Sequence, residues 1–309
     1  MKINFLSYLN PFKKGFVGGG ELINRQIISD AKLFDIDIKY GYRENTLISR
    51  VLPPNLNLHK NPDLWILSDI FNIPTHKLSF NSGLLMDIIS NHKFIHFDNA
   101  YVDICANGAL PCNGIRNNLC HNCLKNPLRE LLYKNSKANF FLSPLHLKTI
   151  NQFFENIYLS KSYIVDPFID TNKFYNFHME RDIEYLYVGT ISDYKGYSNI
   201  KEKFGDKGDQ FYFVGPKSNS LQLFSNNYLG IKSASELPLI YNRAKNFVHL
   251  PSWKEPMART VLEAALCGCK LIVNENVGAA SFDFDLSSSD YYINNIEKFY
   301  KSVFNIISK

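Results

Sequence analysis

The sequence has no long apolar run, little cysteine and only a small excess of positive charge. No hydrophobic stretch approaches the roughly 18 residues that cross a bilayer, so no membrane-spanning helix is expected. Six cysteines are too few and too unevenly spread for a disulfide framework in 309 residues, which indicates a reduced, cytoplasmic protein. A net charge of +5 suits an anionic nucleotide, or peripheral attachment to an anionic membrane, but is too weak to argue for nucleic acid by itself.

The composition is that of a folded globular protein. Hydrophobic residues make up 45% of the chain and charged residues 20%, and the length allows about two domains with cores of their own. Strand patterns alternate with helical patterns in both halves, which predicts an α/β protein with two Rossmann-like domains facing each other across a cleft. We expect a first domain over residues 1–169 with a cysteine-rich insertion at about 103–125, a second over 170–292, and a terminal helix over 293–309.

One stretch, residues 250–269, combines a loop, a helix and two glutamates. An apolar strand leads into a Pro-Ser break, and a helix pattern with Pro256 at its first position continues to Gly268. The free N–H groups at such a helix start favour a phosphate. Glu255 lies in the loop and Glu263 in the second helical turn, so we expect the two carboxylates to face different parts of one ligand.

This stretch resembles the signature of GT-B glycosyltransferases of the retaining, metal-independent, glycogen-synthase-like group, the family 4 type. The resemblance rests on the seven residues between Glu255 and Glu263, followed by alanines and a small turn at Gly268. It implies that Glu255 contacts the sugar of a nucleoside diphosphate sugar, that Glu263 binds the ribose, and that the terminal helix crosses back onto the first domain. The donor-binding positions implied at the helix start are Pro256, Met257, Ala258 and Arg259. Ala258 stands where the family usually has glycine. An ordinary amphipathic helix with two exposed glutamates is the alternative.

A run of three glycines, Gly18–Gly20, stands between a predicted first strand, Lys2–Ser7, and a helix pattern. Without Cβ atoms, Gly19 and Gly20 let backbone N–H groups approach a ligand, although a flexible loop would explain the run equally well. The run resembles the glycine-rich loop with which the family helps to bind the diphosphate and shape the acceptor pocket.

His96 is predicted to stand at the carboxyl end of the strand Lys93–Asp98, where side chains of an open α/β sheet face the ligand. In the resembling family a histidine at the corresponding place often touches the donor sugar, so His96 is a catalytic candidate. A histidine hydrogen-bonded inside the fold is the alternative.

A strand of the second half ends in Gly189, and Lys195 follows in the next loop. A lysine there is placed to pair with a diphosphate and stabilise it as a leaving group, although a solvated loop lysine is the alternative. The resembling family usually has an arginine directly after the strand glycine, where this chain has Thr190. Arg259 is a candidate for supplying the missing charge.

Four cysteines lie in the predicted insertion: Cys105, Cys112, Cys120 and Cys123. The last two have the spacing of a zinc knuckle, and four thiolates suit a tetrahedral structural Zn²⁺. The first two are further apart than the pairs of a zinc ribbon, so free thiols or a redox-labile disulfide are equally open. A zinc ion here would order the loop and take no part in the chemistry.

These residues predict a retaining sugar transferase that uses a UDP- or GDP-sugar, needs no cofactor for catalysis, and acts on a glycan or a lipid-linked glycan. No Asp-x-Asp triad stands between residues 250 and 269, so dependence on Mg²⁺ is not predicted. One alternative acceptor is a modified nucleic-acid base, although no aromatic and basic stripe supports it. Because Thr190 and Ala258 depart from the family pattern, a catalytically silent nucleotide-sugar binder is another alternative. The cysteine knuckle would also be compatible with a module that docks a protein or nucleic acid.

Overall fold

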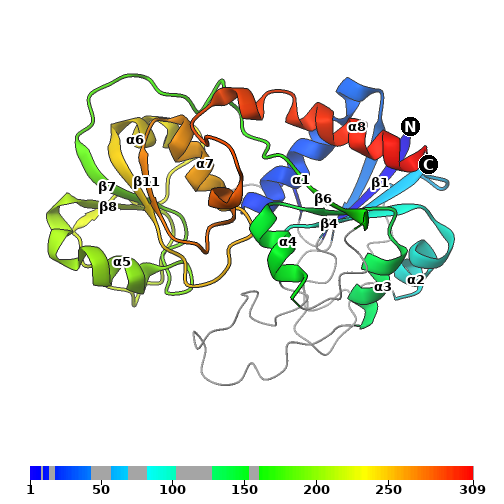
Figure 1. Cartoon of the computed structure of the whole chain (residues 1–309), viewed down its shortest axis with the longest axis horizontal. Helices are drawn as coiled ribbons and strands as arrows, with labels where there is room; N and C mark the ends of the chain where they lie inside the picture. Colours follow the sequence, from blue (N-terminus) through cyan, green and yellow to red (C-terminus); the bar gives the residue numbers. More distant parts are fainter. Residues whose placement is uncertain are drawn as a thin grey trace.

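The computed structural model describes residues 1–7, 10–13, 18–42, 57–68, 82–101, 127–152 and 160–308. Two parallel β-sheets lie side by side, each with helices packed around it (Figure 1). The first sheet is built from the first half of the chain and the second from the second half. The predicted α/β architecture is confirmed, whereas the domain limits at residues 169 and 292 stay predictions.

Within the described residues the first sheet has six parallel strands in the order β2-β1-β3-β4-β5-β6. They are β1 (Lys2–Ser7), β2 (Asp37–Tyr42), β3 (Leu64–Ser68), β4 (Phe94–Asp98), β5 (Asn139–Phe141) and β6 (Ser162–Ile164). The helices around them are α1 (Gly19–Asp30), η1 (Ala31–Phe34), α2 (Ser82–Asn91), α3 (Pro127–Asn135) and α4 (Pro144–Ile150). Every residue of β3 and β4 is buried, because these central strands are covered on both faces, and this explains their continuous apolar runs.

The second sheet, again counted within the described residues, has five parallel strands in the order β11-β10-β7-β8-β9. They are β7 (Ile183–Val188), β8 (Phe211–Val214), β9 (Asn227–Tyr228), β10 (Ala244–His249) and β11 (Lys270–Val273). Its helices are α5 (Tyr197–Phe204), η3 (Gly205–Gln210), α6 (Leu237–Arg243), α7 (Arg259–Leu266), η4 (Gly278–Ser281) and η5 (Ser289–Tyr292). Parallel strands end at one edge, so the loops that carry the predicted site gather there.

The terminal helix, α8 (Asn295–Ile307), returns to the first sheet and brings the end of the chain close to its start (Figure 1). The ring of Phe299 lies edge-on to that of Phe97 in β4, with centroids 5.9 Å apart, and the Tyr300 hydroxyl donates to the carbonyl of Ile27 in α1. The predicted crossing of this helix onto the first half is confirmed. Neither α8 nor any other helix of the described residues is long and apolar enough to cross a bilayer.

Candidate active site

Two loops of the second half meet at the carboxyl edge of its sheet. One follows β7 and carries Lys195, and the other follows β10 and carries Glu255. Gly196 has a φ of +95°, and a Cβ on it would lie 2.0 Å from the carbonyl oxygen of Leu250. Glycine allows both the left-handed conformation and the close approach, so it brings the lysine loop onto the glutamate loop.

The carboxylate of Glu255 is held between two nitrogen atoms. Nζ of Lys195 lies 2.6 Å from Oε1, and Nε2 of His249 lies 2.6 Å from Oε2. The side chain of Glu255 is 12% exposed and that of His249 is 3% exposed, so both bonds are largely shielded from water. Charge-assisted hydrogen bonds in such surroundings fix the orientation of the carboxylate.

The charges around Glu255 decide its ionisation. Burial by itself raises the pKa of this carboxyl group, because a poorly solvated site disfavours charge. Lys195 and His249 outweigh burial and hold the pKa well below its ordinary value of 4.5. The Lys195 ammonium also lies 4.9 Å from the ring centroid of Trp253 and 5.8 Å from that of Tyr194, so two aromatic faces help to place it.

The loop after β11 fixes the backbone of Glu255. The Glu255 N–H donates to the carbonyl of Asn276 at 2.7 Å, and the Gly278 N–H donates back to the Glu255 carbonyl at 2.9 Å. A Cβ on Gly278 would lie 2.2 Å from the carbonyl oxygen of Pro256, so this approach also requires glycine. The glutamate is therefore held through its backbone as well as its side chain.

The helix of the motif begins at Arg259 and not at Pro256, so the predicted helix start is wrong. Pro256 and Met257 belong to the loop, where the Met257 carbonyl accepts a hydrogen bond from Ala279 at 2.6 Å. Because the loop after β11 uses these backbone groups, the helix starts only beyond them. Ala258 caps it with a φ of +65°, in the left-handed region that glycine adopts most readily. A glycine at this position would suit that conformation.

Glu263 lies in α7 and is 5% exposed. Its Oε1 accepts from Nε of Arg259 at 2.8 Å, and its Oε2 accepts from the Tyr241 hydroxyl at 3.2 Å. Burial raises the pKa of Glu263, and Arg259 opposes that effect. The same guanidinium donates to the carbonyl of Phe168 at 2.8 Å, so Arg259 links Glu263 to the segment between the two sheets. These bonds use two of the five N–H donors of Arg259, so its candidacy for the missing arginine stays a prediction.

The start of α1 approaches the start of α7. A Cβ on Gly19 would lie 3.7 Å from Cβ of Arg259, whereas a Cβ on Gly20 would lie 3.0 Å from Oδ1 of Asn99 inside the first half. Two helix N termini, one from each sheet, therefore lie near each other. Their free N–H groups make an environment that favours an anion.

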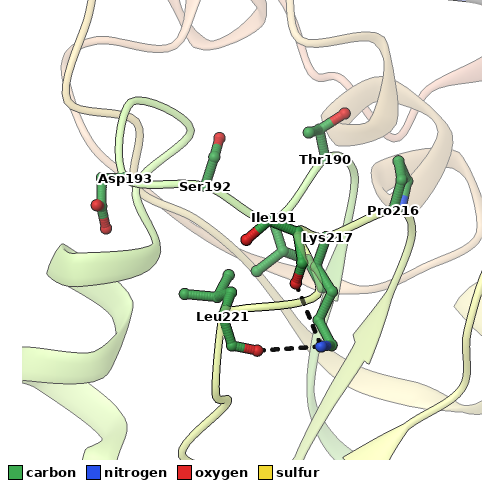
Figure 2. A pocket seen from close by; sticks show the side chains of 8 residues that line it. Thr190, Ile191, Ser192, Asp193, Pro216, Lys217 and Leu221 are labelled. Atoms are coloured by element: carbon green, nitrogen blue, oxygen red, sulfur yellow. Dashed lines mark hydrogen bonds between the residues drawn. The ribbon is translucent and has the colours of Figure 1, made fainter.

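Thr190 follows β7, and its carbonyl accepts a hydrogen bond from the Tyr187 hydroxyl at 2.8 Å. The N–H of Gly189 donates to the carbonyl of Val214 at 2.9 Å, so the ladder between β7 and β8 continues past the strand ends. A cavity of about 360 Å³ opens between the loops after these strands (Figure 2). It is lined by Thr190, Ile191, Ser192, Asp193, Pro216, Lys217, Ser218 and Leu221.

Lys217 is the cationic residue in the lining of this cavity. Figure 2 shows its side chain turned toward two carbonyl groups, and Nζ lies 3.0 Å from the oxygen of Leu221 and 3.5 Å from that of Ser218. These carbonyls take two of the three donors of the Lys217 ammonium. Lys195, in contrast, lies directly beside Glu255.

His96 is buried in the interior of β4, so its expected position at the strand end is wrong. It is 1% exposed, and its ring packs edge-on to Tyr133 with centroids 5.0 Å apart. The strand continues to Asp98, because Phe97 and Asp98 still pair with β5. The structure supports the reading of His96 as an internal histidine.

Three further residues of this region were not predicted. Trp253 lies edge-on to Tyr101 of the first half, with ring centroids 5.7 Å apart, and Ser143 donates to the Pro256 carbonyl at 2.6 Å. Of these three residues, only His249 could have been singled out from the sequence. A histidine at the end of an apolar strand that leads to two glutamates is unusual. The other two contacts join residues that are far apart in the chain, so no local pattern indicates them.

Among the described residues no three histidine, cysteine or carboxylate side chains are grouped so as to hold a metal ion. Cys105, Cys112, Cys120 and Cys123 lie outside the described residues, so the zinc site stays a prediction. Two Asp-x-Asp triads occur, at 35–37 and 283–285, and their carboxylates are exposed.

No family model and no curated protein sequence matches the chain. Solved structures do match. A sucrose-phosphate synthase from Thermosynechococcus elongatus superposes with a TM-score of 0.66 at 13% identity, over 97% of this chain and 90% of that one. HepE from Anabaena, solved with UDP and glucose, has a TM-score of 0.58 at 12% identity, over 100% and 93% of the two chains.

A third match is an α-glucosyltransferase solved with UDP and a 13-mer DNA. Its TM-score is 0.55 at 13% identity, and the alignment covers 100% of this chain and 99% of that one. The chain has the GT-B fold. The predicted fold class is therefore confirmed, and with identities this low the likeness concerns the fold.

Proposed function

We propose that the protein is a retaining glycosyltransferase that moves a sugar from a UDP- or GDP-sugar to a glycan or lipid-linked glycan. The observation that carries the proposal is the Lys195–Glu255 pair, set at the edge of the second sheet close to the start of α7. The glycine start of α1 reaches the same helix from the first half. A cation, a fixed carboxylate and helix N termini together suit an activated sugar diphosphate.

The likeness to nucleotide-sugar enzymes supports this reading of the site. HepE of Anabaena, whose fold this chain shares, has also been solved with UDP-glucose. The spacing of Glu255 and Glu263 resembles the family 4 signature, and the structure gives the two carboxylates separate partners. We infer that they serve different ends of one donor.

Each residue then has a defined role. Lys195 and the amides at the start of α7 would neutralise the diphosphate as it leaves, and Glu255 would orient the sugar ring. Glu263 would accept from the ribose hydroxyls, since a carboxylate has about four acceptor sites and, within the part of the chain that the structure describes, two of them are occupied. No residue has to act as a nucleophile.

The reaction itself is a single exchange of bonds at the anomeric carbon. The bond from this carbon to the diphosphate oxygen breaks, and a bond to the acceptor oxygen forms on the same face. The proton of the acceptor hydroxyl passes to an oxygen of the leaving diphosphate. Family resemblance, not geometry, supplies this stereochemical course and its independence of metal.

Two features favour a second candidate, a silent nucleotide-sugar binder. Thr190 stands where a second cation is usual, and Lys195 is bonded to Glu255 rather than free. A silent binder would hold the donor and turn it over no faster than water does.

Donor binding and hydrolysis separate the two candidates. A thermal-shift panel of UDP, GDP, ADP, CDP and their sugars should first identify the nucleotide, since a ligand that binds the native state raises the melting temperature. Release of free sugar from that donor, lost in Glu255→Ala and kept in Glu202→Gln on the exposed face of α5, supports the enzyme. Binding without release supports the silent form, and no binding at all contradicts both.

The cysteine cluster calls for a separate measurement. We propose a structural zinc ion held by its four thiolates and no cofactor for the chemistry itself. Metal analysis of the purified chain and of the double variant Cys120→Ser/Cys123→Ser checks this. Equal zinc content in the two proteins would contradict the site.

A further inference from the structure

His249 is a buried polar residue for which the proposed chemistry has no role. It is the last residue of β10 and is 2% exposed. Its ring stacks on Tyr187, with centroids 5.8 Å apart and an interplanar angle of 23°. Nε2 lies 2.6 Å from Oε2 of Glu255, and because a carboxylate only accepts hydrogen bonds, Nε2 carries the proton. Nδ1 is buried and has no hydrogen-bond partner among the described residues.

The two nitrogens that hold Glu255 differ in their freedom to move. His249 belongs to a strand and is held by an aromatic face, whereas Lys195 extends from a loop and is 22% exposed. A lysine side chain has several rotatable bonds and can follow a ligand, while a stacked imidazole at a strand end cannot. A donor diphosphate would therefore compete with Glu255 for Lys195 and not for His249.

Loss of Lys195 alone would destabilise the ionised form of Glu255. The carboxylate would remain buried with one partner fewer, and burial favours its neutral, protonated form. A protonated carboxyl group orients a sugar hydroxyl differently, because one of its oxygens becomes a donor.

We propose that His249 is a positioning residue that keeps Glu255 ionised and correctly oriented while Lys195 moves to the diphosphate. The proposal rests on the proposed function for the movement of Lys195, and on the geometry for the rest. The titratable groups that face His249 are Glu255, Lys195 beyond it, and Tyr187 in β7, on which Tyr194 acts electrostatically. Burial raises the pKa of Tyr187 well above 10.0, so that ring stays neutral and Glu255 is the group that His249 serves.

The first test observes Glu255 directly in the ligand-free full chain. Carbon NMR of protein labelled at the glutamate carboxyl groups follows its titration between about pH 4 and pH 8, with Glu255→Gln used to assign the signal. In Lys195→Met, which imitates departure of the lysine, Glu255 should stay ionised throughout. In Lys195→Met/His249→Phe it should take up a proton within this range, since Phe preserves the ring stacking but removes the N–H. In Lys195→Met/His249→Gln the carboxyl group of Glu255 should stay partly ionised, because Gln still offers an N–H donor.

A merely structural histidine would give another pattern. Glu255 that stays ionised in Lys195→Met/His249→Phe, or already takes up a proton in Lys195→Met, would overturn the proposal. So would equal behaviour of the Phe and Gln variants.

The second test uses turnover and covers the case in which the double variant does not fold. In donor hydrolysis His249→Phe should lower kcat about tenfold or more while donor KM changes less than about threefold. The acidic limb of its kcat profile should move to higher pH, because Glu255 then gains its proton more easily. An unchanged limb with a lower melting temperature would indicate a structural role and overturn the proposal. If the wild-type protein neither binds nor hydrolyses any donor, the proposed function is contradicted. The carboxyl titration still tests whether His249 keeps Glu255 ionised.

Discussion

Nζ of Lys195 lies 2.6 Å from Oε1 of Glu255, although the two residues are sixty positions apart along the chain. The lysine follows β7 and the glutamate follows β10, and these strands are neighbours in the second sheet. The pair is therefore a product of strand order. Because Lys195 and Glu255 lie this close in a buried site, both the stability of the fold and the proposed chemistry depend on the Glu255 carboxylate.

The ion pair should make stability sensitive to acid. The folded-state pKa of Glu255 is lowered from 4.5, so its contribution is present above about pH 4.5 and is lost as the pH falls toward the folded-state value. Urea unfolding of wild type and Glu255→Gln should differ by about 2 kcal/mol near neutral pH, because the Gln side chain has no charge and offers one acceptor oxygen where Lys195 and His249 each use one. The difference should shrink steadily below about pH 4.5. A gap that is constant or grows toward acid would contradict the pairing.

Gly196 should tolerate no side chain. Gly196→Ala combines a left-handed φ of +95° with a Cβ that would lie 2.0 Å from the carbonyl oxygen of Leu250. The matched control is Gly230→Ala, which has a φ of +74° and no atom within 4 Å of its Cβ. In urea unfolding we expect the free energy of unfolding to fall by about 1 kcal/mol in the control, from strain alone, and by at least about 2 kcal/mol in Gly196→Ala. Gly196→Ala should also lose nucleotide binding. Equal losses would mean that the two loops separate freely.

Ser143 joins the two halves through one hydroxyl. Its Oγ accepts from the His146 N–H at 3.0 Å as the cap of α4 and donates to the carbonyl of Pro256 at 2.6 Å. Ser143→Ala should cost about 1–2 kcal/mol in urea unfolding, since both bonds are lost. Thr149→Val serves as the control, because it removes a hydroxyl that donates to the Leu145 carbonyl within α4 and makes no bond to the described residues of the second half. Only Ser143→Ala should also weaken nucleotide binding, and a change shared by both variants would contradict a link between the halves.

Ala258 should gain from replacement by glycine. Its φ of +65° destabilises an L residue in the folded state by about 1–2 kcal/mol. Replacement by glycine removes this strain but also increases the freedom of the unfolded chain, which offsets about half of the gain. Ala258→Gly should therefore raise the free energy of unfolding by about 0.5–1 kcal/mol. Ala280→Gly, at an exposed residue of η4 without a positive φ, should lower it. A loss in Ala258→Gly as large as in the control would show that this strain is absent.

Local patterns alone are sufficient for much of this molecule. The predicted strand Lys2–Ser7 matches β1, and the motif strand, loop, helix and closing Gly268 appear in the predicted order. Continuous apolar runs mark strands buried on both faces, and a glycine with positive φ marks a helix end, so both are readable from neighbouring residues. The spacing of Glu255 and Glu263 likewise depends on one helix and the loop before it.

Packing between distant segments decides the rest. The helix of the motif starts at Arg259 because the loop after β11 hydrogen-bonds to the backbone of Glu255 and Met257, while Ser143 bonds to the Pro256 carbonyl. His96 lies inside its strand because β5 continues the pairing past it. Lys195 and His249 meet on one carboxylate because β7 and β10 are adjacent, and a sequence pattern has no access to which strands become neighbours.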